Sequence, residues 1–461
     1  MPDLSATLDY LDADGEAALE RLFALLRCQS ISTDPAYAEE CQKAADWLAA
    51  DLTTIGFDAR VAPTKGHPIV VGHHDGPAGA PHILFYGHYD VQPVDPIELW
   101  HSDPFDPQVV TREDGSQMIV GRGTGDDKGQ LMTFIEACRA LKTTTGGLPC
   151  RVTILLEGEE ESGGANLPGF LAEHADELKA DIAVICDTGM WDRETPAITT
   201  MLRGMLGEEL TIHAASRDLH SGFYGGAAAN PLRIISTVLA GLHDDSGRVT
   251  IPGFYDGVPE IPEEIRRQWG GLGFSDTEFL GEIGLSIPTG EAGKGALEAT
   301  WARPTAEVNG IWGGYTGAGF KTVIPAEAHA KISFRLVGTQ DPLAIREAFR
   351  AQIRAALPAD CRVTFHGHGA SQASVMPLDN PAFETARKAL SEEWGKEAAF
   401  IGAGGSIPVV GELQSQLGLA SLLIGFGQND DAIHSPNEKY EMRSFRRGAR
   451  SFVRVLSALG A

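Results

Sequence analysis

The sequence is poor in cysteine and in basic charge, and each shortage excludes a class of protein. Its six cysteines in 461 residues include no C-x-x-C pair, which excludes a disulfide scaffold and fits reduced thiols in a cytoplasm. Lys and Arg number 37 against 63 Asp and Glu, a formal net charge of −26. Because such a chain repels polyphosphates, we expect no nucleic acid and no anionic membrane among its partners.

Long hydrophobic runs are absent as well. No stretch approaches the roughly 18 apolar residues that cross a membrane. The N-terminal segment MPDLSATLDYLDADGEAALERLF has early acidic residues instead of the basic start and apolar run of a signal peptide. Hydrophobic residues make up 43% and charged residues 22% of the chain, as in globular proteins. We therefore expect a globular, cytoplasmic protein.

Short apolar strands alternate with helical segments in the first part of the chain. The strand-like runs are residues 69–71, 83–86, 152–156 and 182–186, with a helical pattern over 130–141. The same style returns after residue 380, with a helical pattern over 381–394 and an apolar run over 420–424. This alternation predicts an α/β fold with a mixed, mostly parallel sheet flanked by helices.

The middle of the chain has a different character. It combines a strand-like run at 207–214, a helical pattern over 231–242, β-like runs within 321–336 and a long polar excursion, rich in Gly and Pro, over 244–303. These features fit an α+β unit of the size of a separate domain. We therefore predict a discontinuous first domain, residues 1–198 and 371–461, interrupted by an inserted α+β domain, residues 199–370.

Side chains that bind metals follow several of the expected strands. They stand in the segments ILFYGHYD, RVTILLEGEEESGG, DIAVICD, ASLLIGFGQNDDAIHS and the glycine-rich turn GRGTGDDKGQ. In an open α/β sheet, ligand-binding groups collect beyond the carboxyl ends of the strands. Taken singly, an acidic triplet is usually solvated and a lone histidine is rarely a ligand. Five segments that end in the same way together predict a metal site.

Six short sequence motifs between about residues 80 and 440 are similar to those of a known protein family. They are GHYDVQP, GRGTGDDKGQ, LEGEEESGG, DLHSGFYGG, GGSIPV and DDAIHSPNE. They resemble the di-zinc metallopeptidase family of carnosinase-like cytosolic dipeptidases, acetylornithine deacetylase, succinyl-diaminopimelate desuccinylase and aminoacylase. DDKG, LHSG with its glycine pair, and GGSIPV are most similar to the dipeptidase branch. The resemblance implies a zinc-exopeptidase-like catalytic domain, with the inserted domain serving as lid and dimerisation unit.

The resemblance implies two Zn²⁺ per subunit. Its ligand set is His88 and Asp187 on one ion, Glu161 and His434 on the other, and Asp126 as the carboxylate that bridges both. Mixed imidazole and carboxylate donors suit zinc, and Mn²⁺ or Co²⁺ could substitute.

Three further residues are expected to be catalytic without binding metal. Asp90 lies two residues beyond His88, so on a strand it returns to the same face and can accept the other ring N–H of His88. Glu160 resembles the family's general base. His220 resembles a histidine that relatives supply from the partner subunit of a homodimer, where it would help to stabilise the oxyanion. The structural alternatives are a turn aspartate at 90 and a loop histidine at 220.

Substrate recognition is expected from the inserted domain and the GGSIPV string. Arg335 corresponds to a family arginine suited to binding a carboxylate. Weaker candidates are Asn309, Thr316, Gly405 and Ser406. Gly402 and Ala403 depart from the pattern of similar dipeptidases, which have an Arg-Glu pair there, and this departure leaves the substrate class open.

The predicted function is a cytoplasmic, homodimeric di-zinc hydrolase that cleaves the amide bond of dipeptides or similar small peptides, with Glu160 as general base. The alternative within the family is an N-acyl-amino-acid deacylase or desuccinylase. A third hypothesis is a non-catalytic metal-binding scaffold. The presence of Asp90, Glu160 and His220 argues against a scaffold, because none of the three is needed to bind metal.

Overall fold

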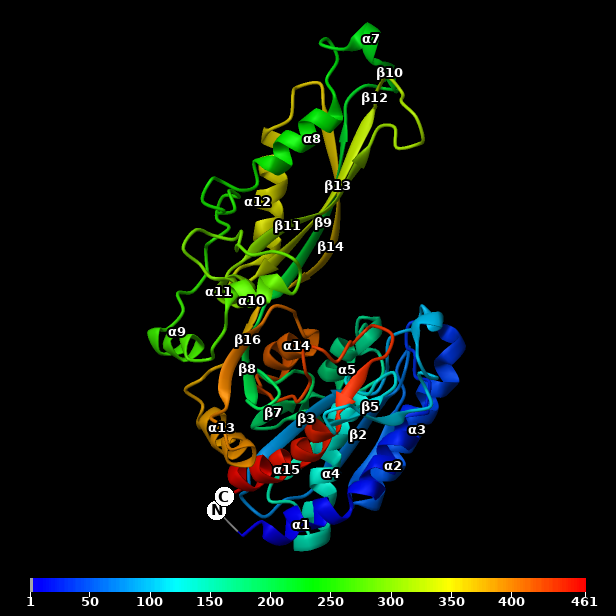
Figure 1. Cartoon of the computed structure of the whole chain (residues 1–461), viewed down its shortest axis with the longest axis vertical. Helices are drawn as coiled ribbons and strands as arrows, with labels where there is room; N and C mark the ends of the chain where they lie inside the picture. The colour runs from blue at the N-terminus through cyan, green and yellow to red at the C-terminus, as the bar shows by residue number, and fades with distance from the viewer. Residues whose placement is uncertain (1–2) are drawn as a thin grey trace. The chain divides into compact units, whose positions relative to one another are not determined.

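The computed structural model describes residues 3–461 and divides the chain into two compact units. Unit 1 comprises the chain up to Thr200, Met376–Ile401 and Pro408–Ala461, and unit 2 comprises Met201–Val375 and Gly402–Ile407. Each unit is described by itself below (Figure 1). Among the described residues, no helix is both long and apolar enough to cross a membrane.

One short segment falls in a different unit from the one that the sequence predicts. We place Gly402–Ile407 in the first domain from the sequence, whereas the structure groups it with unit 2. Arg203 explains the difference, because its backbone N–H donates to Gly405 O at 3.1 Å and its Nε donates to Gly404 O at 3.0 Å. These bonds link the segment to the strands of unit 2.

A nine-stranded sheet has the order β1-β2-β6-β3-β7-β17-β8-β15, with β16 paired to β8, and its strands from β1 to β17 in this order form the centre of unit 1, whereas β15 belongs to the residues of unit 2. The central strands β6, β3, β7 and β17 pair in parallel, whereas β1, β2, β8 and β15 join antiparallel. The strands are β1 Asp58–Ala62, β2 Ile69–His74, β3 His82–His88, β6 Arg151–Glu157, β7 Ile182–Ile185, β8 Ala197–Leu202, β15 Ser374–Val375, β16 Ala399–Ala403 and β17 Ser421–Leu423. The predicted mixed sheet is confirmed, and its parallel part is the centre.

Aromatic side chains join this sheet to its helices. Phe85 of β3 stacks on Phe134 of α4 with ring centroids 3.8 Å apart, and Phe452 of α15 lies edge-on to Phe134 at 5.3 Å. All three rings are buried, and each contributes roughly 1.5–3 kcal/mol to stability. The helices of unit 1 are α1 Ser5–Ala13, α2 Gly15–Leu26, α3 Ala38–Thr54, α4 Lys128–Thr145, α5 Leu167–Glu173, α6 Ala175–Leu178, α13 Pro381–Trp394, α14 Pro408–Leu417 and α15 Met442–Leu459.

Smaller elements complete unit 1. A separate sheet has the order β18-β5-β4. Its strands and the short 3-10 helices are β4 Gln108–Thr111, β5 Gln117–Val120, β18 Lys439–Glu441, η1 Pro35–Tyr37, η2 Ile97–Leu99 and η3 Glu160–Ser162.

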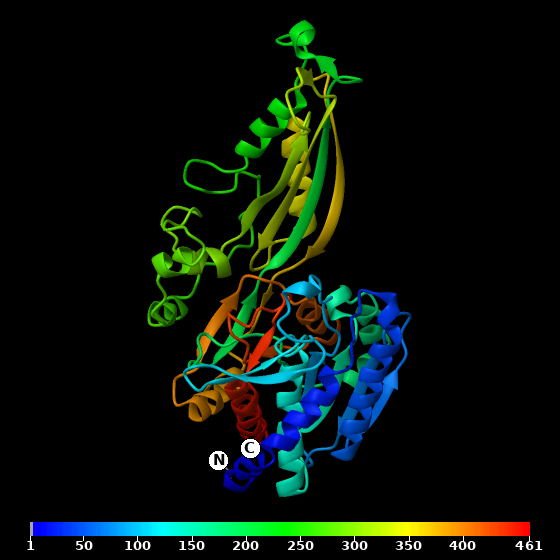
Figure 2. The same cartoon turned by 45° about the vertical axis from the view of Figure 1, so that its right-hand side comes forward.

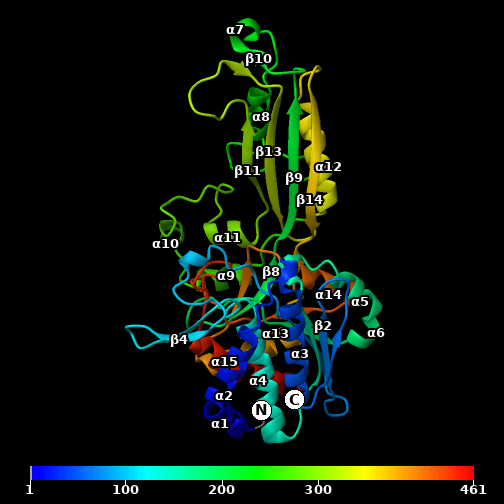
Figure 3. The same cartoon turned by 90° about the vertical axis from the view of Figure 1, so that its right-hand side faces the viewer.

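Unit 2 is an antiparallel sheet covered on one face by two helices. The four strands lie side by side in the order β11-β13-β9-β14 (Figure 3). Helices α8 and α12 pack against them, and Figure 2 shows both on the same face. The strands and helices are β9 Gly204–His213, β11 Thr305–Gly313, β13 Glu327–Leu336, β14 Arg362–Ser371, α8 Pro231–Ala240 and α12 Pro342–Ala355. Because buried residues alternate along β9, one face of the sheet forms the core of this unit.

Three helices begin at an Asn-Pro or Asp-Pro pair, which explains why the sequence marks their starts. The side chains of Asn230, Asp341 and Asn380 each accept a backbone N–H in the first turn of α8, α12 and α13. Proline follows at the first helical position, where a backbone N–H would have no partner within the helix, so the helix loses no hydrogen bond to proline. The predicted starts at residues 231 and 381 are confirmed.

The excursion over 244–303 contains three short helices and packs within unit 2. These and the remaining elements of the unit are α9 Glu263–Gly270, α10 Asp276–Gly281, α11 Ala296–Trp301, α7 Ser221–Tyr224, β10 Leu219–His220 and β12 Val323–Ile324. A Cβ at Gly402 would lie 2.7 Å from Trp301 Cβ and 2.9 Å from Met201 Cγ. The end of α11 therefore occupies the space that a side chain at position 402 would need.

Candidate metal centre

The predicted metal-binding side chains follow the four strands that pair in parallel. β3 ends at His88, and β6 pairs with it in register as far as Glu157, just before η3. β7 ends two residues before Asp187, and the loop after β17 leads to His434. Because these strands run in the same direction, their carboxyl ends meet at one edge of the sheet.

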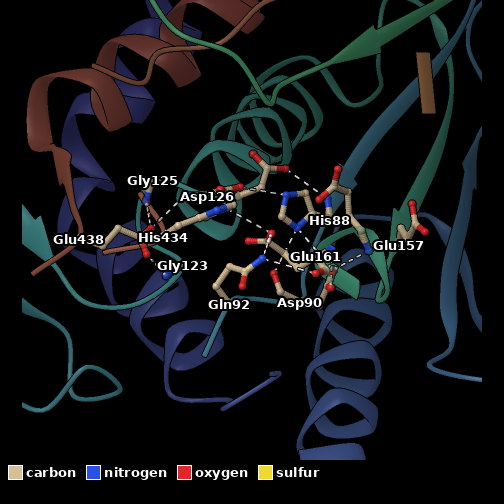
Figure 4. Close-up of polar contacts among 12 residues, drawn as sticks. His88, Asp90, Gln92, Gly123, Gly125, Asp126, Glu157, Glu161, His434 and Glu438 are labelled. Carbon is tan, nitrogen blue, oxygen red and sulfur yellow. Dashed lines mark hydrogen bonds and ion pairs between the residues drawn. The ribbon is translucent and has the colours of Figure 1, made fainter. Parts of the chain in front are cut away.

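The structure brings the five predicted ligands into two overlapping groups. The donor atoms of His88, Asp126 and Asp187 lie within 4.8 Å of one another, as do those of Asp126, Glu161 and His434. His88 Nε2 lies 3.1 Å from Asp126 Oδ1, and His434 Nε2 lies 2.9 Å from Asp126 Oδ2. One carboxylate thus faces a different histidine with each of its oxygens (Figure 4).

These donor groups fit two divalent cations. Each group offers one imidazole nitrogen and two carboxylates, the mixed donor set that zinc accepts. Among residues 3–461, no lysine or arginine forms an ion pair with Asp126, Glu161 or Asp187. Burial and then the charge of Asp126 raise the pKa of Asp187 well above its ordinary value. A cation between these carboxylates would remove that repulsion.

Without cations, the two histidines take protons and bond to the acids. Hydrogen bonds to Asp126 and Glu161 raise the pKa of His434 to about 10. Burial lowers the pKa of His88, but its bonds to Asp126 and Asp90 outweigh burial and raise that pKa well above the ordinary value. Cations that bind here would displace these protons.

The glycine-rich turn before α4 places Asp126 at the centre. A Cβ at Gly129 would lie 1.9 Å from Thr124 O, so only glycine lets the turn fold back on the start of the helix. The Asp126–Asp127 peptide is cis. Asp127 is fully buried, and its Oδ2 accepts the backbone N–H of His88 at 3.2 Å. The two aspartates therefore differ in role, since only Asp126 belongs to the donor groups.

Asp90 contacts more of the centre than the sequence predicts. His88 Nδ1 lies 3.2 Å from the backbone O of Asp90, its hydrogen-bond partner, and 3.4 Å from Asp90 Oδ1. The carboxylate of Asp90 also accepts the backbone N–H of Glu160 at 3.2 Å and of Glu161 at 3.0 Å. Asp90 is fully buried. One residue therefore contacts both a histidine and the η3 turn.

The acidic triplet of η3 divides into three environments. Glu159 accepts the side-chain N–H of Asn166 at 2.7 Å, which is a structural bond. Glu161 accepts Gln92 Nε2 at 2.7 Å while it faces His434. Within the described residues, the carboxylate of Glu160 has no hydrogen-bond partner, and burial raises its pKa. Glu160 is therefore the member of the triplet whose carboxylate is left without a hydrogen bond among the described residues. Gln92 was not predicted, although it stands in the string GHYDVQP.

The remaining predicted site residues lie in unit 2. Arg335 is half-buried on β13, Asn309 is at the bulge of β11, and Thr316 is exposed in the loop that follows. Gly405 and Ser406 belong to the segment linked to Arg203. His220, at the end of β10, is exposed, and its Nδ1 accepts Gly222 N–H at 3.0 Å. The structure brings none of these six residues into the donor groups of unit 1.

Arg203 is a further polar residue near the predicted substrate-binding segment that the sequence reasoning missed. Burial, followed by the charge of Arg335, lowers its pKa to about 10. Among the described residues, neither arginine forms an ion pair. Arg203 stands in the string LRG, which matches no motif, so nothing in the sequence indicated that this arginine would lie near Gly404 and Gly405.

A cavity of about 400 Å³ opens beside the donor groups within unit 1. It is lined by Asp126, Asp187, Gln130 and the loop after β17, including Gln428 and Ile433. Two groups of side chains that could each hold a metal ion, a half-buried glutamate beside them and an adjoining cavity are the arrangement typical of a metal-dependent hydrolase.

The comparisons with known proteins identify the family. The pattern of Peptidase family M20/M25/M40 matches residues 84–458, and the chain belongs to this family. It is 27% identical to the Cys-Gly metallodipeptidase dug1 of Schizosaccharomyces pombe, over 99% of this chain and 98% of that protein. It is also 27% identical to the Beta-Ala-His dipeptidase of Rattus norvegicus, over 86% of this chain and 80% of that protein.

A solved structure supports the same assignment. The M20 family metallo-carboxypeptidase Sso-CP2 from Sulfolobus solfataricus superposes with a TM-score of 0.82 at 29% identity, covering 96% of this chain and 99% of that one. The resemblance read from the six strings is therefore confirmed, and the chain is a metallopeptidase.

Proposed function

We propose that the protein is a dipeptidase whose site holds two divalent cations, with zinc as the expected metal. The observation that carries the proposal is the position of Asp126, whose two oxygens face His88 and His434 separately. The names of the relatives support the substrate class, because they include a Cys-Gly metallodipeptidase and a Beta-Ala-His dipeptidase.

In this proposal the two donor groups each hold one cation. His88 and Asp187 would bind the first, Glu161 and His434 the second, and Asp126 would bind both. When bound, the ions would act as Lewis acids on the scissile carbonyl and would make a water molecule more acidic. Mn²⁺ and Co²⁺ accept the same donors and are alternatives to zinc.

Glu160 would carry the proton. Its carboxylate accepts a proton from the attacking water as the water oxygen bonds to the carbonyl carbon. The same proton passes to the amide nitrogen as the C–N bond breaks, which gives a carboxylic acid and an amine; the second proton of the water then moves from the acid to the amine, so the final products are a carboxylate and an ammonium group. Burial raises the pKa of Glu160, a direction that favours holding the proton between these steps.

Unit 2 would supply recognition and oxyanion stabilisation. We assign the carboxylate of the substrate to Arg335, which is half-buried and forms no ion pair among the described residues, with Asn309, Thr316, Gly405 and Ser406 as further contacts. His220 would act on the site of the partner subunit in a homodimer, which its exposure permits. We also place the enzyme in the cytoplasm, in keeping with its six free cysteines.

A substrate panel tests this function. The metal-stripped chain is loaded separately with zinc, manganese or cobalt, and hydrolysis of dipeptides and of N-acyl amino acids is followed by mass spectrometry. Preferential cleavage of dipeptides is expected. Preferential cleavage of acyl amino acids would assign the chain to the deacylase alternative, and stable binding of metal without any turnover would support the scaffold hypothesis.

A further inference from the structure

A buried carboxylate outside the donor groups holds the turn that carries Asp126. Glu438 is fully buried, and both of its oxygens accept two hydrogen bonds. Oε2 accepts Arg122 Nη1 at 2.8 Å and Gly123 N–H at 2.9 Å. Oε1 accepts Gly125 N–H at 2.8 Å and the N–H of Asp126 itself at 3.1 Å. Figure 4 shows Glu438 beside this turn.

Arg122 extends the same contact to a third loop. Its side chain is 1% exposed and forms a buried ion pair with Glu438. Its Nη2 donates to Pro93 O at 2.9 Å, and its guanidinium lies 5.4 Å from the ring centre of Trp100. Pro93 stands five residues after His88. The Arg122–Glu438 pair therefore joins the loop that follows His88 to the two loops that carry Asp126 and His434.

The loop of His434 needs such an anchor. Glu438 follows His434 by four residues. Between them the backbone is unfavourable, because His434 has φ +58° and Asn437 has φ +65°, values that residues other than glycine seldom adopt. A carboxylate suits the anchor because it offers acceptors to all four donors. Glutamine would turn an NH₂ group toward backbone N–H groups.

We propose that Glu438 and Arg122 are positioning residues, which set the spacing between Asp126 and His434 and thereby the affinity of the site for its cations. The inference rests on the metal centre of the proposed function. Partners that orient metal ligands typically contribute about 10- to 100-fold to metal affinity or activity. A residue that served only to stabilise unit 1 would leave metal affinity unchanged once the protein has folded.

The test compares Glu438→Gln with a matched change elsewhere in unit 1. Glu393 is also buried, and it accepts Arg450 Nε at 2.7 Å and Arg454 Nε at 2.8 Å. It belongs to α13 and is absent from both donor groups. The full-length, metal-stripped proteins are titrated with zinc in competition with a chromophoric chelator, and circular dichroism verifies folding. We expect about 10- to 100-fold weaker zinc binding for Glu438→Gln and parental binding for Glu393→Gln.

Each outcome decides between explanations. Equal zinc affinity in the two folded variants would overturn the positioning role. A parent protein that binds no zinc would refute the proposed function instead. If Glu438→Gln does not fold, Arg122→Lys takes its place, since it keeps the positive charge but cannot make both bonds to Glu438 and Pro93. Weaker zinc binding by Arg122→Lys would then support the proposal, and parental binding would contradict it.

Discussion

Replacing Asp90 by asparagine changes little of the side chain's shape but alters every contact that its carboxylate makes; the bond between His88 Nδ1 and the backbone O of Asp90, at 3.2 Å, is kept. The carboxylate faces three donors, the ring Nδ1 of His88 and the N–H groups of Glu160 and Glu161. Asparagine keeps one acceptor oxygen and turns an NH₂ group toward at least one of these donors. A buried donor left without a partner costs about 1–3 kcal/mol, and each remaining bond loses about 1 kcal/mol with the charge.

We therefore expect Asp90→Asn to lower the free energy of unfolding of unit 1 by about 3–5 kcal/mol in the metal-free protein. The same change loosens the turn of Glu160 and takes from His88 Nδ1 the nearby charge of the carboxylate, so kcat should fall by about 10- to 100-fold. Thermal unfolding of the stripped protein and steady-state kinetics of the zinc-loaded protein measure the two effects.

A surface aspartate provides the matched control. Asp341 also accepts two backbone N–H groups, from Leu343 at 2.8 Å and Ala344 at 3.2 Å, but these bonds are exposed, at the start of α12 in unit 2. Asp341→Asn should leave stability and kcat close to those of the parent, because both residues cap helices well. Parental stability and kcat in Asp90→Asn would refute the assigned role of Asp90.

Three further predictions concern the proton, the dimer and pH. Glu160→Gln should retain two equivalents of zinc by mass spectrometry while kcat falls by about 10²- to 10⁴-fold; a variant that kept parental kcat would exclude Glu160 as the base. Mixing inactive Glu160→Gln subunits with inactive His220→Ala subunits should restore activity. One site of each mixed dimer would then combine an intact Glu160 with an intact His220 from the partner subunit. If verified mixed dimers recovered no activity, His220 would belong to the site of its own subunit. The bonds to Asp126 and Glu161 raise the pKa of His434 to about 10, so zinc must displace a proton from this histidine at neutral pH. The apparent zinc affinity should therefore rise by up to about tenfold per pH unit for each histidine proton that is displaced. Zinc titrations that show no dependence on pH between 6 and 9 would contradict this.

The same raised pKa fixes the sign of a stability effect. Protonated His434 stabilises the metal-free fold, and this contribution is complete below the ordinary histidine pKa of about 6.5. It is lost as pH rises through the folded value of about 10. Both trends apply to the stripped protein.

The sequence alone predicts the central sheet and the segments that carry candidate metal ligands, because both depend on local patterns. His88 ends an apolar run, and Glu161 and Asp187 stand just after two others, so the sheet itself gathers them at one edge. The choice of individual ligands within these segments, such as Glu161, Asp126 and His434, depended on the family resemblance. Pairs such as Asn380-Pro381 mark helix starts for equally local reasons.

Contacts between distant segments could not be predicted in this way. Glu438 is separated from Gly123, Gly125 and Asp126 by 312 to 315 residues, and nothing in DDAIHSPNE states which N–H groups its carboxylate will accept. The grouping of Gly402–Ile407 with unit 2 depends on Arg203, about two hundred residues earlier. These bonds arise only when the two segments fold together.

The rate of dipeptide hydrolysis as a function of the metal added to the stripped protein tests the central claim most directly. The two donor groups that share Asp126 predict no activity without metal and a plateau at two equivalents of zinc per chain. Full activity in the stripped protein, or a plateau at one equivalent with no second ion bound, would contradict a two-cation site.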